Sequence, residues 1–167
     1  MVLTKSELIT SLQNEVRILL HLASKIDRDQ LGYRPSPKQR STLELLQYLS
    51  MMGPELVKVA KAGTFDPAAW TAREQAAGAH DFDQTLAVIA GHKDAYPELL
   101  ADISDAELRE EAKFFGDKMT RGAFLVNLVL SGCAAYRTQL FLYLKARGRE
   151  ELSTWNLWAG VDPPAAA

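Results

Sequence analysis

The sequence predicts an all-α protein, a four-helix bundle with a long crossover between its second and third helices. Four segments repeat apolar residues every three or four positions, which is the period of an amphipathic helix. No segment alternates convincingly at the period of two that marks a half-exposed strand. The stretch 63–80 is too long for a tight connection between antiparallel neighbours, so it predicts the crossover.

Composition predicts one soluble domain spanning residues 1–167. Lys and Arg number 19 and Asp and Glu 21, which gives a net charge of −2, and apolar types make up 47% of the chain. Without a basic cluster, nucleic acid is not expected as a partner. The single cysteine, Cys133, excludes an intramolecular disulfide. Because no apolar run approaches about 20 residues and no signal-peptide core is present, we expect a cytoplasmic protein without a membrane partner.

The first two helices begin at capping boxes, in which a Ser or Thr is followed three residues later by Glu. Thr4 and Glu7 open a helix that runs to about residue 26, and Ser41 and Glu44 open the second. Between them, residues 27–40 contain glycine and prolines and predict a loop with one helical turn. The Gly53-Pro54 pair predicts a kink or break before residues 55–61.

The crossover 63–80 reads as the longest irregular stretch, with Trp70 folded back onto the body. Asp81 caps a third helix over 82–102, and Ser104 with Glu107 marks a short turn. Gly116-Asp117 is a turn signal that favours a small hairpin within 113–119.

Thr120 opens the longest helix, which ends near Arg147 and is followed by Gly148. The tail 149–167 is apolar around Trp155 and Trp158, so we expect it to dock on the bundle or on a partner.

Few residues could serve as catalytic groups or metal ligands. His21, His80 and His92 have no histidine at a spacing of three or four, and solvated or structural roles are favoured over metal ligation. Cys133 lies mid-helix among small residues, which favours an inert buried thiol. No glycine-rich phosphate loop, nucleophile elbow or paired-carboxylate signature is present. The sequence therefore assigns no catalytic residue and leaves open whether the protein is an enzyme.

One position in the last helix is unusual. Gly132 lies in mid-helix, where glycine costs about 1 kcal/mol relative to alanine, and Tyr136 follows one turn later on the same face. Either close helix packing or a small cavity lined by tyrosine hydroxyls accounts for this pattern.

Two local patterns resemble the DinB-like (DinB/YfiT) family, and the likeness extends over nearly the whole chain in helix order and loop placement. The patterns are LGYRP at 31–35 with STLELLQYL at 41–49, and GCAAYRTQL at 132–140 with Tyr143-Leu144 and Arg147-Gly148. The resemblance implies a four-helix bundle, a homodimer and a metal site of three histidines, one on the second helix and two on the last. Relatives include thiol-dependent S-transferases and a mycothiol-dependent isomerase.

This chain departs from the family pattern at every metal-ligand position. The resemblance places Tyr48, Gly132 and Tyr136 where the histidines stand, and retains Arg137 and Gln139 as companions. A phenol is a poor ligand at neutral pH and glycine has no side chain, so a degenerate site with no metal and no cofactor is expected.

We therefore expect a small-molecule ligand in an inter-helix pocket formed by Tyr48, Gly132, Tyr136, Arg137 and Gln139. Two alternatives remain: an enzyme resembling the thiol-dependent S-transferases, and a non-catalytic, dimeric interaction protein.

Overall fold

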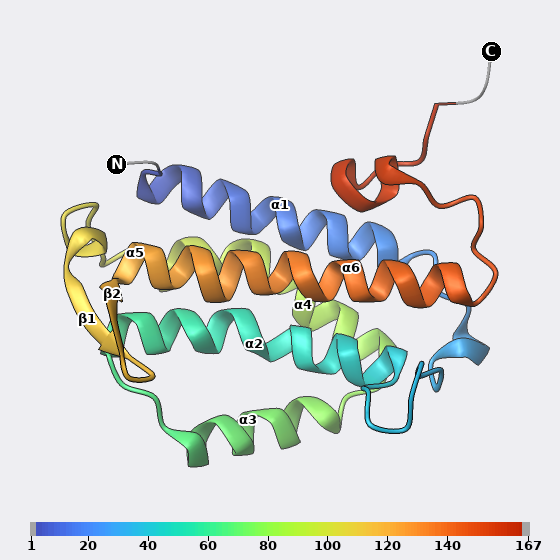
Figure 1. Cartoon of the computed structure of the whole chain (residues 1–167), viewed down its shortest axis with the longest axis horizontal. Coiled ribbons are helices and arrows are strands. Elements are labelled where there is room, and N and C mark those ends of the chain that lie inside the picture. The colour runs from blue at the N-terminus through green and yellow to red at the C-terminus, as the bar shows by residue number, and fades with distance from the viewer. Residues whose placement is uncertain (1–2, 165–167) are drawn as a thin grey trace.

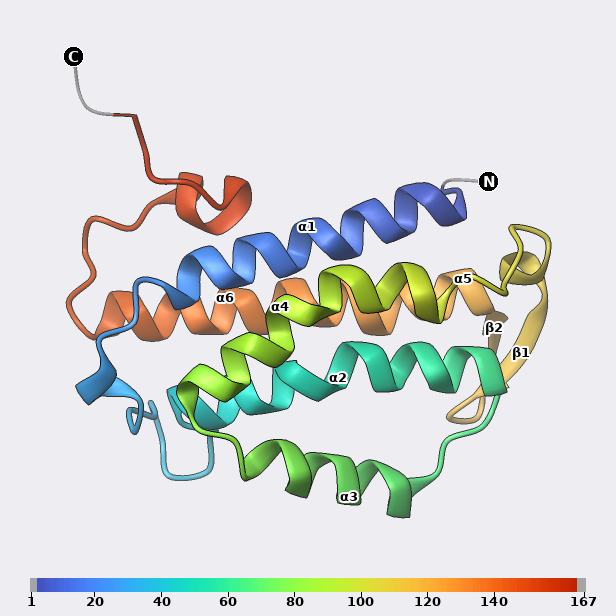
Figure 2. The ribbon, with the colours of Figure 1, turned by 180° about the vertical axis from the view of Figure 1, so that it is seen from behind.

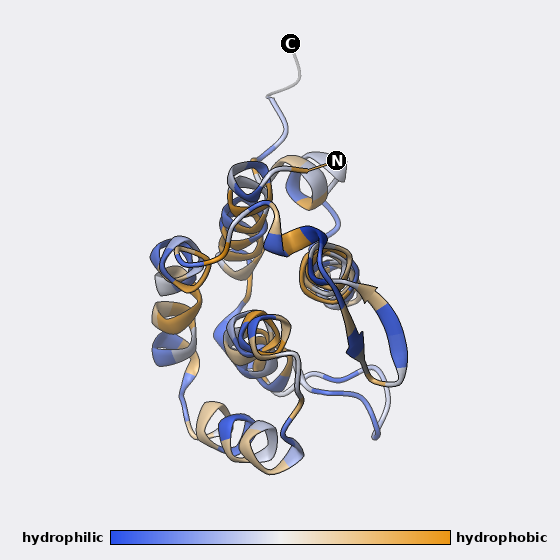
Figure 3. Cartoon of the chain, turned by 90° about the vertical axis from the view of Figure 1, so that its left-hand side faces the viewer, coloured by the Kyte–Doolittle hydropathy of each residue, from blue (hydrophilic) through white to orange (hydrophobic). Residues whose placement is uncertain are grey.

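The computed structural model describes residues 3–164 and confirms the helical bundle (Figure 1). Three of the bundle helices are α1, α2 and α4, and the fourth is a continuous helix whose middle turns are π-helical, assigned as α5, η3 and α6. Their bounds are Lys5–Ala23, Thr42–Ala62, Phe82–Leu99, Arg121–Phe124, Leu125–Leu130 and Ser131–Ala146. α1 and α2 each contact both α4 and α6, so these helices surround a common centre, as the view along the bundle shows (Figure 3).

The predicted helix starts are present, because capping is decided by residues next to each other in the chain. In each capping box the side chain of the N-cap residue accepts a hydrogen bond from the backbone N–H of the residue three positions later. The side chain of that later residue accepts a hydrogen bond from the N-cap backbone N–H in return. The pairs are Thr4 with Glu7, Ser41 with Glu44, and Asp81 with Gln84. The loop between α1 and α2 holds one 3₁₀ turn, η1 (Arg28–Gln30), as expected.

The crossover is not irregular as predicted: it contains α3 (Pro67–Gly78), which lies beside α2 (Figure 2). Asp66 caps this helix by accepting from two backbone N–H groups, and Pro67 takes a first-turn position where its missing N–H costs nothing. The segment is rich in alanine, the best helix former. Only Ala77 is buried, so the segment lacks the apolar stripe that identified the other helices.

Of the predicted kink or break, the break is absent, since α2 runs as one helix through Gly53 and Pro54. Proline has no N–H, so it leaves the carbonyl of Ser50, four residues earlier, without its helical donor. His92 of α4 fills this place, with its Nε2 2.9 Å from the Ser50 oxygen. A Cβ at Gly53 would lie 2.1 Å from the Tyr96 hydroxyl oxygen. Gly53 and Pro54 thus fit α2 closely against α4.

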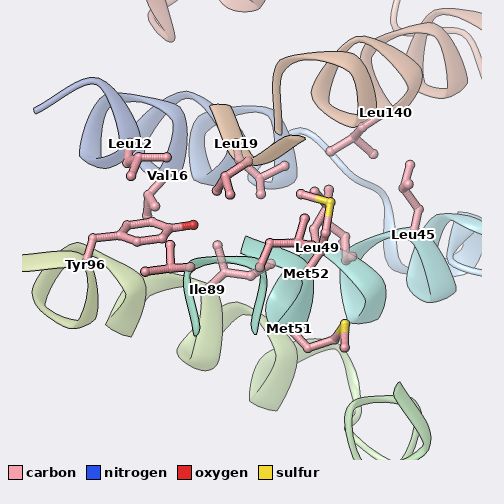
Figure 4. Close-up of a cluster of buried hydrophobic side chains, with 14 of the residues drawn as sticks. Leu12, Val16, Leu19, Leu45, Leu49, Met51, Met52, Ile89, Tyr96 and Leu140 are labelled. Atoms are coloured by element: carbon pink, nitrogen blue, oxygen red, sulfur yellow. The ribbon is translucent and has the colours of Figure 1, made fainter. Parts of the chain in front are cut away.

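The core forms where α1, α2, α4 and the C-terminal helix meet. Figure 4 shows Leu12 and Val16 of α1 over the Tyr96 ring of α4. Farther along, Leu19 of α1 lies near Leu49 and Met52 of α2 and Ile89 of α4. These side chains are at most 7% exposed. Burial of this apolar surface, at roughly 25 cal/mol per Å², is the main force that holds the bundle together.

The small hairpin is confirmed, with its turn one residue earlier than the Gly-Asp signal. Strands β1 (Glu111–Phe114) and β2 (Asp117–Thr120) pair antiparallel. Phe115 and Gly116 form the turn with φ of 52° and 96°, the left-handed pair of a type I′ hairpin. The Phe115 ring lies 5.1 Å from that of Phe65, which holds the hairpin tip against the loop before α3.

The C-terminal segment lies on α1, seen in red in Figure 1. The Arg17 guanidinium donates to the carbonyls of Ala159 and Gly160 at 2.8 and 3.1 Å. Asn156 is fully buried, whereas Trp155 and Trp158 stay 50% and 70% exposed. Residues 165–167 of the expected tail lie outside the described part of the chain.

The C-terminal helix bears on the expectation of a protein without a membrane partner. As one helix over Arg121–Ala146, it contains a window of mean hydropathy 1.2 and is long enough to cross a bilayer. One such helix is weak evidence by itself, because helices of bundles can pass the same test. Only 22% of the window is buried within the described chain.

Candidate functional site

The three positions at which this chain departs from the family pattern come together between α2 and α6. The ring centroids of Tyr48 and Tyr136 are 5.2 Å apart in an edge arrangement. The space beside Gly132 is taken by Met52, whose Cε would lie 3.4 Å from a Cβ at that glycine. Glycine therefore makes room for a thioether, and the close-packing reading of Gly132 accounts for the geometry.

This cluster does not have the donors that a zinc or nickel site needs. The pKa of Tyr48 is raised to about 12, first by burial and then by the neighbouring Tyr136 hydroxyl, so its phenol stays neutral. A neutral phenol is a poor ligand for these metals, and the three positions offer no imidazole nitrogen. Within residues 3–164, no three His, Cys, Asp or Glu side chains lie close enough together to hold a metal ion.

Arg137 lies on the side of α6 that faces α1 and does not join Tyr48. Its guanidinium donates to both carboxylate oxygens of Glu15 on α1, at 2.8 and 3.1 Å, and to the carbonyl of Leu157. Both side chains of this ion pair are largely buried. Its charge is therefore used to fix the tail and α1, and it is not available to an anionic thiol beside Tyr48.

Gln139 contacts Tyr143, one turn later on α6, and not the pair of Tyr48 and Tyr136. Its amide donates to the hydroxyl of Tyr143, which itself donates to the Arg40 carbonyl at 2.9 Å. The residues of the expected pocket thus do not form one site. Tyr48, Gly132 and Tyr136 form a cluster, Arg137 binds α1 and the C-terminal segment, and Gln139 binds the tyrosine that contacts the loop before α2.

The Cys133 thiol is poorly suited to act as a nucleophile. Its pKa is raised to about 12, first by burial and then by the Glu15 carboxylate. The Tyr96 hydroxyl beside it also has a pKa well above the usual value, chiefly because it is buried. Both groups stay protonated near neutral pH, so the thiolate needed for attack is scarce.

The bundle carries a cavity of about 520 Å³ at the end where the chain begins, which sequence reasoning missed. We call it the bundle-end cavity. Its lining is mainly apolar and comes from the start of α1, the 3₁₀ turn η2 (Glu107–Arg109), and the residues from Thr120 into η3. The lining residues are Leu3, Leu8, Leu108, Arg109, Thr120, Gly122, Ala123, Val126 and Asn127.

The π-helical stretch η3 forms part of this wall. A π-turn holds an extra residue, which displaces side chains from the α-helical register, and such turns are frequent at functional sites. Gly122 marks the closest approach, since a Cβ there would lie 3.1 Å from the Leu108 carbonyl oxygen. In the sequence, only Gly122 could have signalled this close approach. Helical periodicity could not reveal the π-turn.

The architecture defines a class, a four-helix bundle with a helical crossover between its second and third members. Within that class the chain has the DinB-like fold, as expected. A DinB-like protein of Bacillus subtilis, YjoA, matches with a TM-score of 0.66 at 20% identity over 87% of this chain and 94% of that one. A DinB-like protein of Bacillus cereus matches with a TM-score of 0.69 at 16% identity over 89% and 95% of the two chains. No protein-family model and no curated protein sequence matches this chain significantly.

Proposed function

We propose that this chain is a metal-independent protein with the DinB-like fold that binds a small, largely apolar molecule in the bundle-end cavity. The observation that carries the proposal is the cavity itself. Its volume of about 520 Å³ falls within the range of about 300–1,000 Å³ typical of small-molecule sites. An apolar wall with a few polar groups is the usual composition of such sites.

The polar groups at the cavity suit one end of an amphiphilic ligand. Arg109, Thr120 and Asn127 line it beside leucine and valine side chains. A ligand with an apolar body and an anionic or hydrogen-bonding end matches this lining, because burial of apolar surface supplies affinity and the polar groups set orientation.

Metal independence is supported by the chemistry at the position that the family resemblance assigns to the metal. Met52 fills the space beside Gly132, and Tyr48 with Tyr136 offers hydroxyls in place of imidazoles. The ligand expected at this position is therefore proposed for the bundle-end cavity instead.

Two phenylalanine substitutions on one helix test the ligand site. Asn127 is exposed and lines the cavity, whereas Ser131, one turn later, is exposed and does not. The probe is 8-anilinonaphthalene-1-sulfonate, an apolar anion whose fluorescence rises on transfer from water. We expect Asn127→Phe to weaken probe binding by about tenfold, equivalent to 1.4 kcal/mol, and Ser131→Phe to leave it unchanged. Equal effects of the two variants, or no saturable binding to the wild type, contradict the proposal.

We also propose that two copies associate through the helix 121–146. Supporting this, only 22% of its apolar window is buried and Leu142 is 58% exposed. An apolar surface of this kind commonly marks an interface, and a two-fold dimer covers the same surface on both copies. Light scattering should give the mass of two chains, and Leu142→Glu should shift it toward one. A mass of one chain at every concentration contradicts this proposal.

A further inference from the structure

The Arg40 side chain, from the loop before α2, lies between an aromatic ring and a carboxylate. Its Cζ is 3.9 Å from the centroid of the Tyr48 ring of α2. One guanidinium nitrogen, Nη2, is 3.0 Å from Oε1 of Glu74 on α3. The crossover helix therefore supplies an acid opposite the aromatic face that α2 presents.

Further rings extend this face. The Trp70 ring centroid lies 6.3 Å from that of Tyr48, and Tyr136 lies on the α6 side at 5.2 Å. Phe65 lies next to Trp70 at 5.6 Å. Aromatic faces carry negative charge density that attracts cations, by about 0.5–2 kcal/mol depending on exposure. Because burial keeps the Tyr48 phenol neutral, the residue is suited to act as a surface for a cation and not as a base.

We propose that Tyr48, Trp70 and Glu74 form a binding site for a small guanidinium compound, which we call the cation site, and that Arg40 occupies it in the free protein. The geometry of the internal guanidinium indicates the ligand class. A planar group stacks on Tyr48 while an N–H donates to the Glu74 carboxylate, a combination that fits guanidinium better than a compact ammonium.

The attachment of Arg40 makes exchange feasible. Its guanidinium makes one ring contact, with Tyr48, and one ion pair, with Glu74, and the Arg40 and Glu74 side chains of this pair are 38% and 44% exposed. Exposed ion pairs contribute at most about 1 kcal/mol. Its backbone is held separately, since the carbonyl accepts from the Tyr143 hydroxyl. The side chain can therefore leave without unfolding the loop, and a ligand needs only to outcompete it.

Chemical rescue tests the cation site independently of the bundle-end cavity. The background carries Trp155→Phe and Trp158→Phe, changes at exposed positions that leave Trp70 as the single tryptophan. In this background Arg40→Ala opens the site, and ethylguanidinium is the probe. We expect a saturable change in Trp70 fluorescence with Arg40→Ala, and binding at least about tenfold weaker with Arg40 present, because the internal guanidinium competes.

Two controls separate recognition from general solvent effects. Ethylurea has a similar planar shape without the charge and should give no saturable change, and adding Glu74→Gln should weaken ethylguanidinium by about tenfold. If Arg40→Ala does not fold by circular dichroism, Arg40→Met retains the apolar stem and takes its place. Absence of binding to a folded Arg40 variant, equal binding of ethylurea, or unchanged affinity with Glu74→Gln overturns the proposal.

Discussion

The hydrogen bond between His92 and Ser50 offers a test of how α2 tolerates an internal proline. A backbone carbonyl only accepts, so Nε2 of His92 carries the proton in this contact, at 2.9 Å. Removing the imidazole by His92→Ala leaves the buried carbonyl of Ser50 without a donor. An unsatisfied buried group costs about 1–3 kcal/mol, and the cavity left by the ring adds to this.

Pro54→Ala supplies the matched second change. It restores a backbone N–H at the position from which an α-helix donates to Ser50, four residues earlier. In that background the carbonyl has a helical donor whether or not His92 is present. The free energy lost on His92→Ala should therefore be smaller by about 1–2 kcal/mol with Pro54→Ala than with the native proline.

Urea unfolding followed by circular dichroism at 222 nm, for the wild type, both single variants and the double variant, gives the four free energies of the cycle. An interaction energy below about 0.5 kcal/mol would refute the reasoning. That result would mean that the cost of His92→Ala comes from packing alone.

Three further predictions concern His92, Gly53 and Cys133. The pKa of His92 is lowered to about 4, mainly by burial, so the unfolded chain takes up the proton first as pH falls from about 6.5 to 4. The free energy of unfolding measured in urea should not change with pH above this window and should be lower by about 3 kcal/mol below it. A free energy of unfolding that is the same at all these pH values would contradict this. Gly53→Ala should destabilise by about 1–3 kcal/mol through the Tyr96 hydroxyl, whereas Gly91→Ala, with open space at its Cβ, should stabilise by up to about 1 kcal/mol; equal effects in urea unfolding would contradict the close approach. Cys133 should react with 5,5′-dithiobis(2-nitrobenzoate) far more slowly in the native protein than in urea, and equal rates would restore the nucleophile reading.

Features decided by neighbouring residues could be predicted from the sequence. Capping boxes such as Ser41 with Glu44 depend on a spacing of three residues and form as expected. The helix α3 was missed because its stability comes from an N-cap, a first-turn proline and alanine, not from an apolar stripe. The continuity of α2 was missed because the donor to the Ser50 carbonyl comes from α4, far away in the chain.

In the candidate site too, features set by residues near in sequence could be predicted, and features set by residues far apart in the chain could not. Gly132 and Tyr136 are one helical turn apart and therefore share a face, as expected. Arg137 is rotated by about 100° from Tyr136 in an α-helix, so it faces α1 instead of the tyrosine pair. The bundle-end cavity depends on a π-helical stretch and on segments far apart in the chain, such as Leu8 and Leu108, which periodicity cannot bring together.

Metal independence is the part of the proposed function that distinguishes this chain from the family pattern. Tyr48, Gly132 and Tyr136 converge, so Tyr48→His, Gly132→His and Tyr136→His together would place three imidazoles at one point. Met52 lies against Gly132 and is flexible enough to move for a side chain there. Three nitrogen donors with an open position are a familiar zinc arrangement.

The most direct measurement is the elemental content of the wild type and the folded triple variant after dialysis against zinc or nickel and then against metal-free buffer. The account predicts less than about one-tenth of an equivalent in the wild type and about one equivalent in the triple variant. One equivalent of tightly held metal in the wild type, lost on Tyr48→Phe, would contradict the claim of metal independence.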